Sequence, residues 1–139
     1  MQIRIQKVRD GAQLPTRAHH DDAGMDIYTC GVHTVMPGET KKIPTGVAFQ
    51  LPDNCVALVW DKSSLGMKGL KTLGGVVDAG YRGEIFILIH NMTQEAYTFS
   101  SGDKVAQILI QKVEFPELIE VSSLDESFRG HGGFGSTGK

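Results

Sequence analysis

Cysteine is scarce in this sequence: Cys30 and Cys55 are the only two in 139 residues. They lie far apart along the chain and do not form the paired spacing that metal sites use. This argues against a disulfide-stabilised fold and against a structural zinc site. Two reduced, partly buried thiols in a cytoplasmic protein are the simplest interpretation.

Long apolar runs and a surplus of positive charge are missing too. No run approaches the length that spans a membrane, and Met1–Arg4 lacks the apolar core of a signal peptide, so we expect no membrane association. Lys and Arg total 14 against 16 Asp and Glu, a formal net charge of −2. Wrapping a nucleic-acid backbone requires a basic surface, so nucleic acid is not an expected partner. A small anionic ligand held by a few local cations remains compatible with this balance.

Sustained helical periodicity is absent, so long helices are not expected. Instead, Val56–Trp60, Ile85–Ile89 and Val105–Ile110 are compact runs of β-formers, typical of strands in a sandwich or barrel. The chain contains 17 Gly and 5 Pro residues, which punctuate these runs at short spacing. We predict one all-β domain, a jelly-roll-like distorted sandwich or barrel, with one short helix at about Ser64–Leu70.

The segment Gly74–Gly83 organises the centre of the chain. Val76-Val77 leads into Asp78, an Ala-Gly turn follows, and Tyr81 precedes the strand-like run Glu84–His90. We predict a β-hairpin with an acid and an aromatic ring at its tip. Asp and Gly are also ordinary hairpin-tip residues, and Tyr81 can pack in a core, so a purely structural role is the alternative.

The C-terminal segment has a different composition. Five glycines lie between Arg129 and Gly138, and such a sequence does not build regular structure by itself. We therefore expect a core at 1–126 and a flexible Gly-rich arm at 127–139. A frayed terminus is one interpretation. The arm also carries an arginine, an aromatic ring and two hydroxyls, which suit a lid that clamps phosphate and covers a base.

Five segments in this order resemble the five motifs of the trimeric dUTP pyrophosphatase (dUTPase) family: Ala23–Ile27, Asp61–Gly66, Gly74–Gly83, Gly102–Gln107 and Arg129–Gly138. The resemblance implies a jelly-roll subunit and a homotrimer with sites between subunits. It also implies Mg²⁺-dependent hydrolysis of dUTP to dUMP and pyrophosphate, which keeps uracil out of DNA and supplies dUMP for dTTP synthesis.

The resemblance gives the two acids distinct roles. Asp78 would hold and deprotonate the water that attacks the α-phosphorus, and as a weak base it would depend on positioning. Asp26 would contact Mg²⁺ through water, with the ion mainly on phosphate oxygens. The run His19–Asp22 offers a second possible metal site. A solvated loop is favoured there, because neighbouring side chains of an extended segment point in opposite directions.

Phosphate contacts are implied for Lys62, Ser63 and Ser64 in the second motif. Lys62 stands where the family usually has arginine, so it keeps the charge but lacks the planar fork, and orientation would depend more on Ser63 and the backbone amides. Helix capping is the alternative role for the two serines. Gln107, in the fourth motif, would contact phosphates across a subunit boundary.

Recognition of the nucleoside is implied for the third motif, with backbone groups reading the uracil edge. Tyr81 would pack flat on the deoxyribose and leave no room for a 2′-hydroxyl. The arm would close the site, with Arg129 on the γ-phosphate and Phe134 stacked over uracil. The remaining implied contacts are Thr72, Gly75, Val76, Val77 and Phe86 around the base, and Gly135, Ser136 and Thr137 in the arm.

Two rival functions remain at this point. A dCTP deaminase of the same superfamily needs an acid/base carboxylate beside the base amino group, which is not evident here. A non-catalytic nucleotide-binding module is the second rival. The presence of Asp26, Asp78, Tyr81 and Arg129 favours the enzyme.

Overall fold

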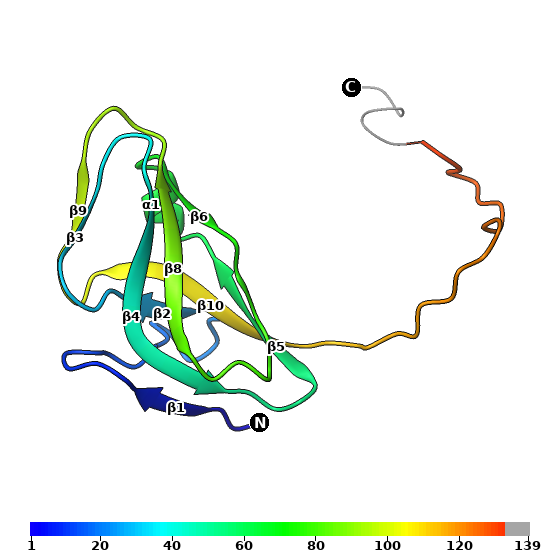
Figure 1. The fold of residues 1–139 in the computed structure, drawn as a ribbon, viewed down its shortest axis with the longest axis horizontal. Coiled ribbons are helices and arrows are strands. Elements are labelled where there is room, and N and C mark those ends of the chain that lie inside the picture. Colours follow the sequence, from blue (N-terminus) through cyan, green and yellow to red (C-terminus); the bar gives the residue numbers. More distant parts are fainter. Residues whose placement is uncertain (133–139) are drawn as a thin grey trace.

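The computed structural model describes residues 1–132, and it consists almost entirely of antiparallel strands (Figure 1). One four-stranded sheet has the order β1-β4-β8-β6, with bounds Arg4–Lys7, Thr40–Gln50, Glu84–Asn91 and Leu70–Leu73. A second has the order β2-β10-β5-β7, with bounds Met25–Tyr28, Lys104–Lys112, Cys55–Trp60 and Val76–Val77. A small third sheet pairs β3 and β9, with bounds His33–Val35 and Tyr97–Phe99.

The core lies between the two larger sheets. Strand β8 alternates, with Ile85, Ile87 and Ile89 buried and the residues between them more exposed. Strands β5 and β10 bury Ala57 and Ile108 in the same apolar cluster. Alternation of this kind is what packs two sheet faces together. The predicted all-β, jelly-roll-like sandwich is therefore confirmed.

The predicted central hairpin is wrong in its pairing. Strand β7 pairs with β5, through Ala57 opposite Val77, whereas β8 pairs with β6, through Leu73 opposite Leu88. The chain therefore leaves the first sheet after β6 and crosses to the second. Gly75 makes the crossing, with φ +132 and its ideal Cβ position 2.8 Å from the Val59 carbonyl oxygen. Only glycine fits there without strain.

The helix is shorter than expected. Helix α1 covers Ser63–Gly66, and Leu70 already begins β6. Its N-cap residue is Lys62, with no side-chain cap hydrogen bond. The capping role considered for Ser63 and Ser64 is therefore wrong, and both hydroxyls lie on the exposed surface.

Beyond β10 the chain leaves the body as an extended arm, orange to red in Figure 1. Its last backbone hydrogen bond to the body, among residues 1–132, runs from the Val113 amide to the Asn54 carbonyl at 3.0 Å. Within the same residues, no helix is long and apolar enough to cross a membrane.

Candidate active site

A cavity of about 320 Å³ lies between β7 and β8, which belong to different sheets. One strand has joined the second sheet and the other has stayed in the first, so neither completes the other's hydrogen-bond ladder. The cavity brings together five of the expected site residues: Val76, Val77, Asp78, Tyr81 and Phe86.

The β8 wall presents backbone groups to this cavity. The Ile85 carbonyl accepts a hydrogen bond from Thr45 Oγ1 of β4 at 2.6 Å, so the polar groups of Ile85 face β4. Phe86 stands opposite Pro44, which has no N–H to donate. Because polar backbone groups alternate sides along a strand, the N–H and C=O of Phe86 face away from β4, toward β7.

The β7 wall follows the same rule. The Gly75 carbonyl accepts the Val59 amide of β5 at 2.8 Å, so Gly75 faces β5. By alternation Val77 faces β5 as well, and the N–H and C=O of Val76 face the cavity. Val76 and Phe86 therefore line opposite walls with backbone donors and acceptors, an arrangement suited to a flat heterocyclic edge.

Asp78 and Tyr81 lie at the mouth of the cavity, on the predicted turn. The Tyr81 amide donates to the Asp78 carbonyl at 3.1 Å, and the Asp78 side chain is exposed. The Tyr81 hydroxyl donates to the Glu84 carbonyl at 2.9 Å. Its ring lies over Gly83, whose ideal Cβ position is 2.4 Å from the Tyr81 hydroxyl oxygen. The ring thus forms a fixed wall.

A separate charged cluster surrounds Asp26. Its carboxylate accepts Lys62 Nζ at 2.5 Å and Lys104 Nζ at 2.6 Å. Burial opposes ionisation of Asp26, but the hydrogen bonds from Lys104 and Lys62 outweigh it and hold its pKa below the ordinary value. Two ammonium groups against one carboxylate leave a local net charge of +1. That is an environment for an anion.

Gln107 joins this cluster through the backbone. Its Nε2 donates to the Asp61 carbonyl at 2.9 Å, and its side chain lies against Gly24. The Asp61 carboxylate accepts the Thr72 amide at 2.7 Å and the Lys71 ammonium. Burial opposes its ionisation, but the Lys71 and Thr72 hydrogen bonds keep the Asp61 pKa low. Thr72, buried and hydrogen-bonded to Asp61, thus ties β6 to the loop carrying Lys62.

Asp78 of the cavity and Lys62 of the Asp26 cluster are far apart within one chain. Val77 pairs with Ala57, so Asp78 is level with Val56, six residues before Lys62. At about 3.3 Å per residue their backbones lie roughly 20 Å apart. Arg129 is on the arm, where its Nε donates to the Gly132 carbonyl at 2.8 Å. The predicted contacts at Phe134, Gly135, Ser136 and Thr137 fall outside the described residues.

Several contacts could not be predicted from the sequence, because their partners are remote along the chain. Lys104 binds Asp26, Lys42 stacks on Phe86 with Nζ 3.8 Å from the ring centroid, and Arg9 pairs with Glu84. No short motif connects these partners. Only Lys104, inside a segment already singled out, carried a usable signal.

The residues fit a hydrated magnesium ion carried by the ligand better than a protein cage. Among residues 1–132 no group of three or more His, Cys, Asp or Glu side chains could hold a metal. Asp26 offers one carboxylate beside two ammonium groups. Mg²⁺ keeps several waters and suits one or two carboxylates plus phosphates. At the alternative segment, His19 Nδ1 lies 3.4 Å from Asp22 and both are solvent-accessible.

Related proteins share the sequence pattern along the chain. The dUTPase family model matches residues 10–138. A deoxyuridine 5′-triphosphate nucleotidohydrolase of Mycolicibacterium gilvum is 46% identical over 134 residues, covering 90% of this chain and 87% of the relative. The enzyme of the same name from vaccinia virus is 38% identical over 136 residues, covering 98% and 92%.

Solved structures share the fold. The dUTPase of Staphylococcus bacteriophage 80alpha, with dUpNHpp, has a TM-score of 0.93 at 28% identity, over 99% of each chain. The dUTPase of phage phi11 of S. aureus, described with a structural Mg(II) ion, has a TM-score of 0.85 at 27% identity, over 91% of this chain and 100% of that one. With the family model spanning nearly its whole length, this chain belongs to the dUTPase family.

Proposed function

We propose that this chain hydrolyses dUTP to dUMP and pyrophosphate, at sites assembled from more than one copy of the chain. One observation carries the proposal: the cavity between β7 and β8 has Asp78 and Tyr81 at its mouth and inward-facing backbone groups on both walls. Its volume of about 320 Å³ is in the range of small-molecule pockets.

Uracil selection follows from the cavity walls. Uracil presents two carbonyl acceptors and one N–H donor, whereas cytosine presents an amino donor in place of one acceptor. Fixed backbone donors and acceptors at Val76 and Phe86 can pair with the edge of uracil, whereas cytosine would leave some of these groups unpaired. An unpaired buried polar group is costly, which makes such a site selective. Thr72, Gly75 and Val77 hold the walls in place.

The chemical step is in-line attack on the α-phosphorus. Asp78 orients a water and takes its proton, the new bond forms between that water's oxygen and phosphorus, and pyrophosphate leaves. Mg²⁺ bound to the phosphates would neutralise their charge, with Asp26 facing its water shell. The residues of the chain place the water and the phosphates relative to each other.

Phosphate binding falls to the positive cluster and the arm. Lys62 supplies a cation, Gln107 a polar side chain, and exposed Ser63 and Ser64 supply hydroxyls and amides next to it. Arg129 of the arm would bind the γ-phosphate, with Phe134, Gly135, Ser136 and Thr137 completing the lid. Closing a lid on a triphosphate and releasing it from the product would favour turnover.

A homotrimer is supported by the distance between the two half-sites. An attacking water lies about 3–3.5 Å from phosphorus and about 3 Å from its base, so phosphate-binding groups must approach Asp78 closely. Within one chain Lys62 is roughly 20 Å away. A second copy must therefore supply it, and the family resemblance favours three copies. Light scattering should give about three times the 15.1 kDa chain mass; a fully active monomer would contradict the assembly.

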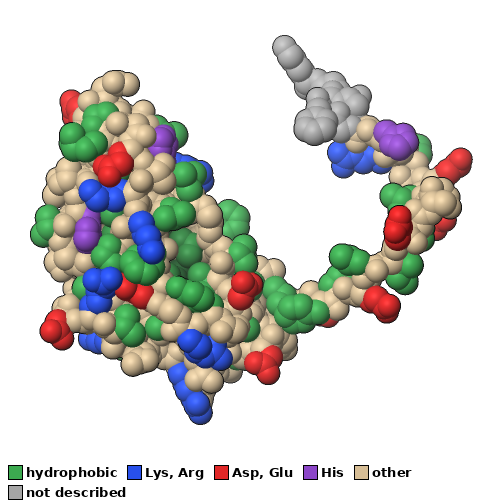
Figure 2. All heavy atoms as spheres, viewed as in Figure 1, with side chains coloured by type: hydrophobic (Ala, Val, Ile, Leu, Met, Phe, Trp, Pro, Cys, Tyr) green, Lys and Arg blue, Asp and Glu red, His purple; other side chains and the backbone are tan. Residues whose placement is uncertain are grey.

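The arm also favours association between copies. It exposes Phe115, Leu118 and Ile119 among Glu114, Glu117 and Glu120, and Figure 2 shows hydrophobic and acidic side chains alternating along it. Strand β1 is a sheet edge that carries Arg4 and Lys7. An acidic, apolar segment on one copy and a basic edge on another are complementary in charge. Cytoplasmic location is proposed alongside, in keeping with two free buried cysteines.

Pyrophosphate release from a panel of dUTP, dCTP, dTTP and UTP tests the activity. We expect dUTP to be strongly preferred. Asp78→Asn should retain nucleotide binding, measured by calorimetry, and lose about 100- to 10,000-fold in turnover, the usual contribution of a general base. Undiminished hydrolysis by this variant would remove Asp78 from the mechanism. Ammonia release from dCTP would favour the deaminase, and absence of pyrophosphate from dUTP a non-catalytic module.

A further inference from the structure

We infer that Arg9, which precedes all five segments that resemble the family motifs, is a positioning residue for sugar selection. It acts through Glu84 on the ring of Tyr81. The inference rests on the proposed function, because it assigns discrimination between deoxyribose and ribose to a contact outside the nucleotide pocket.

The first link is a forked ion pair between the N-terminal loop and the start of β8. Arg9 Nε donates to Glu84 Oε1 at 2.7 Å and to Oε2 at 2.9 Å. The Glu84 side chain is only 11% exposed. It also accepts the Gly46 amide at 2.9 Å, so its carboxylate is held from two sides by charge-assisted hydrogen bonds.

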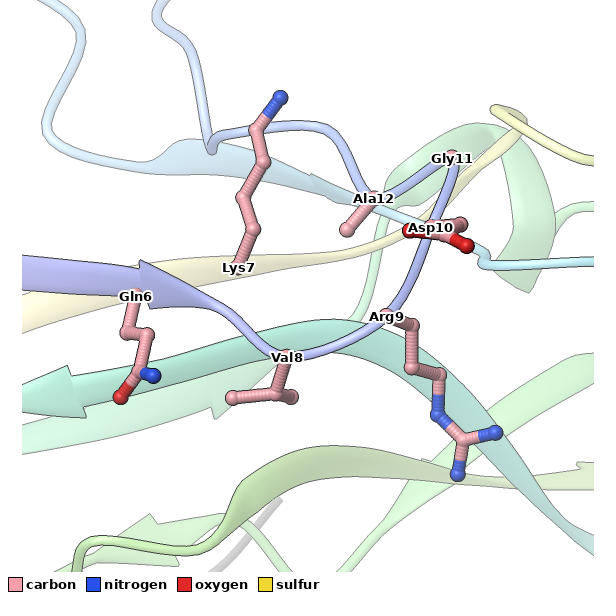
Figure 3. A pocket seen from close by; sticks show the side chains of 7 residues that line it. All are labelled: Gln6, Lys7, Val8, Arg9, Asp10, Gly11 and Ala12. Carbon is pink, nitrogen blue, oxygen red and sulfur yellow. The ribbon is translucent and has the colours of Figure 1, made fainter.

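The loop that carries Arg9 is itself anchored to the sheet. The Val8 amide donates to the Gly46 carbonyl at 2.8 Å. Arg9 is one of the residues 6–12 that line a hollow of about 790 Å³, and Figure 3 shows its side chain extending in the opposite direction to that of Lys7, toward the neighbouring strands. Its guanidinium is paired with the Glu84 carboxylate and is therefore not a free cation.

The second link passes from Glu84 to the sugar wall. The Glu84 carbonyl accepts the Tyr81 hydroxyl at 2.9 Å, and the ring is pressed over Gly83. Because the Glu84 side chain is held in place, the Glu84 carbonyl that accepts the Tyr81 hydroxyl is held in place too. A tyrosine ring that excludes a 2′-hydroxyl by contact must not move by more than a fraction of an ångström. The hydrogen bond that holds the ring therefore determines how well the site distinguishes deoxyribose from ribose.

Arg9 also contacts the other wall. Its guanidinium carbon lies 6.0 Å from the Phe86 ring centroid, and Lys42 Nζ lies 3.8 Å from the same centroid. The two cations restrain the Phe86 side chain on the outer face of β8. The neighbours of Phe86 in the strand, Ile85 and Ile87, remain held by β4, so base selection should respond less to Arg9 than sugar selection does.

The test compares Arg9→Gln with Arg17→Gln, an exposed arginine whose Nε donates to the Asp22 carbonyl at 2.8 Å and which makes no ion pair among the described residues. We expect the ratio of kcat/KM for dUTP over UTP to fall by about tenfold in Arg9→Gln, the effect of losing a charge-assisted hydrogen bond. The ratio for dUTP over dCTP should change less than twofold. Arg9→Lys should restore part of the loss, and Arg17→Gln should match the wild type in both ratios.

A second pair of measurements separates positioning from general destabilisation. In a Tyr81→Phe background, which lacks the hydroxyl link, Arg9→Gln should cause no further loss of sugar discrimination. Calorimetric binding of dUDP and UDP gives the same comparison without turnover. Equal losses of both ratios, or additive effects of the two substitutions, would overturn the inference. A wild-type protein that neither hydrolyses dUTP nor distinguishes dUDP from UDP would instead remove the proposed function along with it.

Discussion

At the scale of single residues, Gly83 determines how the Tyr81 ring lies beside the cavity between β7 and β8. A Cβ there would lie 2.4 Å from the Tyr81 hydroxyl oxygen and 2.6 Å from Cζ, so the ring would have to move. Gly80, in the same turn, has nothing within 4 Å of its ideal Cβ and no positive φ. These two glycines are therefore a matched pair.

We predict that Gly83→Ala lowers kcat/KM for dUTP by about 10- to 100-fold, because displacing a substrate-positioning group by about 1 Å has costs of that size. Gly80→Ala should stay within about twofold of wild type. Steady-state pyrophosphate release measures both. Equal behaviour of the two variants would mean that the Tyr81 ring does not have to lie over Gly83.

Acid sensitivity also originates in particular side chains. Asp26 and Glu84 both have pKa values below their ordinary 3.8 and 4.5. Burial raises the pKa of Glu84, but hydrogen bonds from Arg9 and the Gly46 amide outweigh it. A depressed carboxyl pKa contributes stability above the unfolded-state value, and this is lost as pH falls through the folded value.

The melting temperature should accordingly change little between pH 7 and about 5 and fall below about 4. Asp26→Asn and Glu84→Gln, combined, should lower stability at pH 7 and flatten the acid-side decline. Circular dichroism melts from pH 7 to 3 measure this. If the double variant declined as steeply as wild type, other carboxylates would be responsible.

At the scale of elements, the run of β-formers was enough to predict β5, β8 and β10. The partner of β7 was not predictable, because a two-residue strand carries no period, and the chain has to cross from the first sheet to the second before β7 pairs with Ala57 and Leu58. Ser63 and Ser64 predicted a helix start, but the chain turns into β6 within one turn. Local patterns give element type; remote packing decides which elements meet.

The candidate site divides in the same way. Asp78, Tyr81 and Asp26 were identifiable because they belong to short segments with a family resemblance. Arg9 and Glu84 are 75 positions apart, and only the folded chain brings them together. Nothing in the sequence distinguishes Arg9 and Glu84 from other charged residues, and their pairing is visible only in the structure.

Gly75 allows a test of the crossing between sheets. Gly75→Ala combines φ +132 with a Cβ 2.8 Å from a backbone oxygen, while Gly74→Ala combines φ +71 with an ordinary contact of 3.7 Å. We expect Gly75→Ala to lower the free energy of unfolding by about 2–4 kcal/mol and Gly74→Ala by about 1 kcal/mol. Urea unfolding at one protein concentration measures both. The reverse order would argue against the crossing as described.

At the scale of the whole molecule, copies that share sites should rescue one another. Asp78→Asn and Lys62→Gln should each be nearly inactive alone. If each site takes Asp78 and Lys62 from different chains, random reassembly of an equal mixture leaves about a quarter of the sites intact. Recovery of about a quarter of wild-type activity after co-refolding is the expected outcome. No recovery would place both residues of a site on one chain.

The arm offers a second test at this scale. Removing 127–139, which carries the proposed lid, should abolish turnover of dUTP. It should not change the melting temperature, because the last described hydrogen bond from the arm to the body is at Val113. A chain ending at Lys112 should in addition associate less well. Light scattering and pyrophosphate release distinguish the two truncations. A trimer that survives the shorter ending would show that the arm is dispensable for association.

Strands β7 and β8 line one cavity but belong to different sheets. Among residues 1–132 the amides of Val76 and Phe86 have no partner strand, so under the proposed function a bound base would bridge the two sheets at this point. Deuterium uptake at those two amides should slow when nucleotide binds, while Ile87, already bonded within its own layer, reports no change. While it is bound, the nucleotide would then connect the two sheets of the sandwich through hydrogen bonds to both.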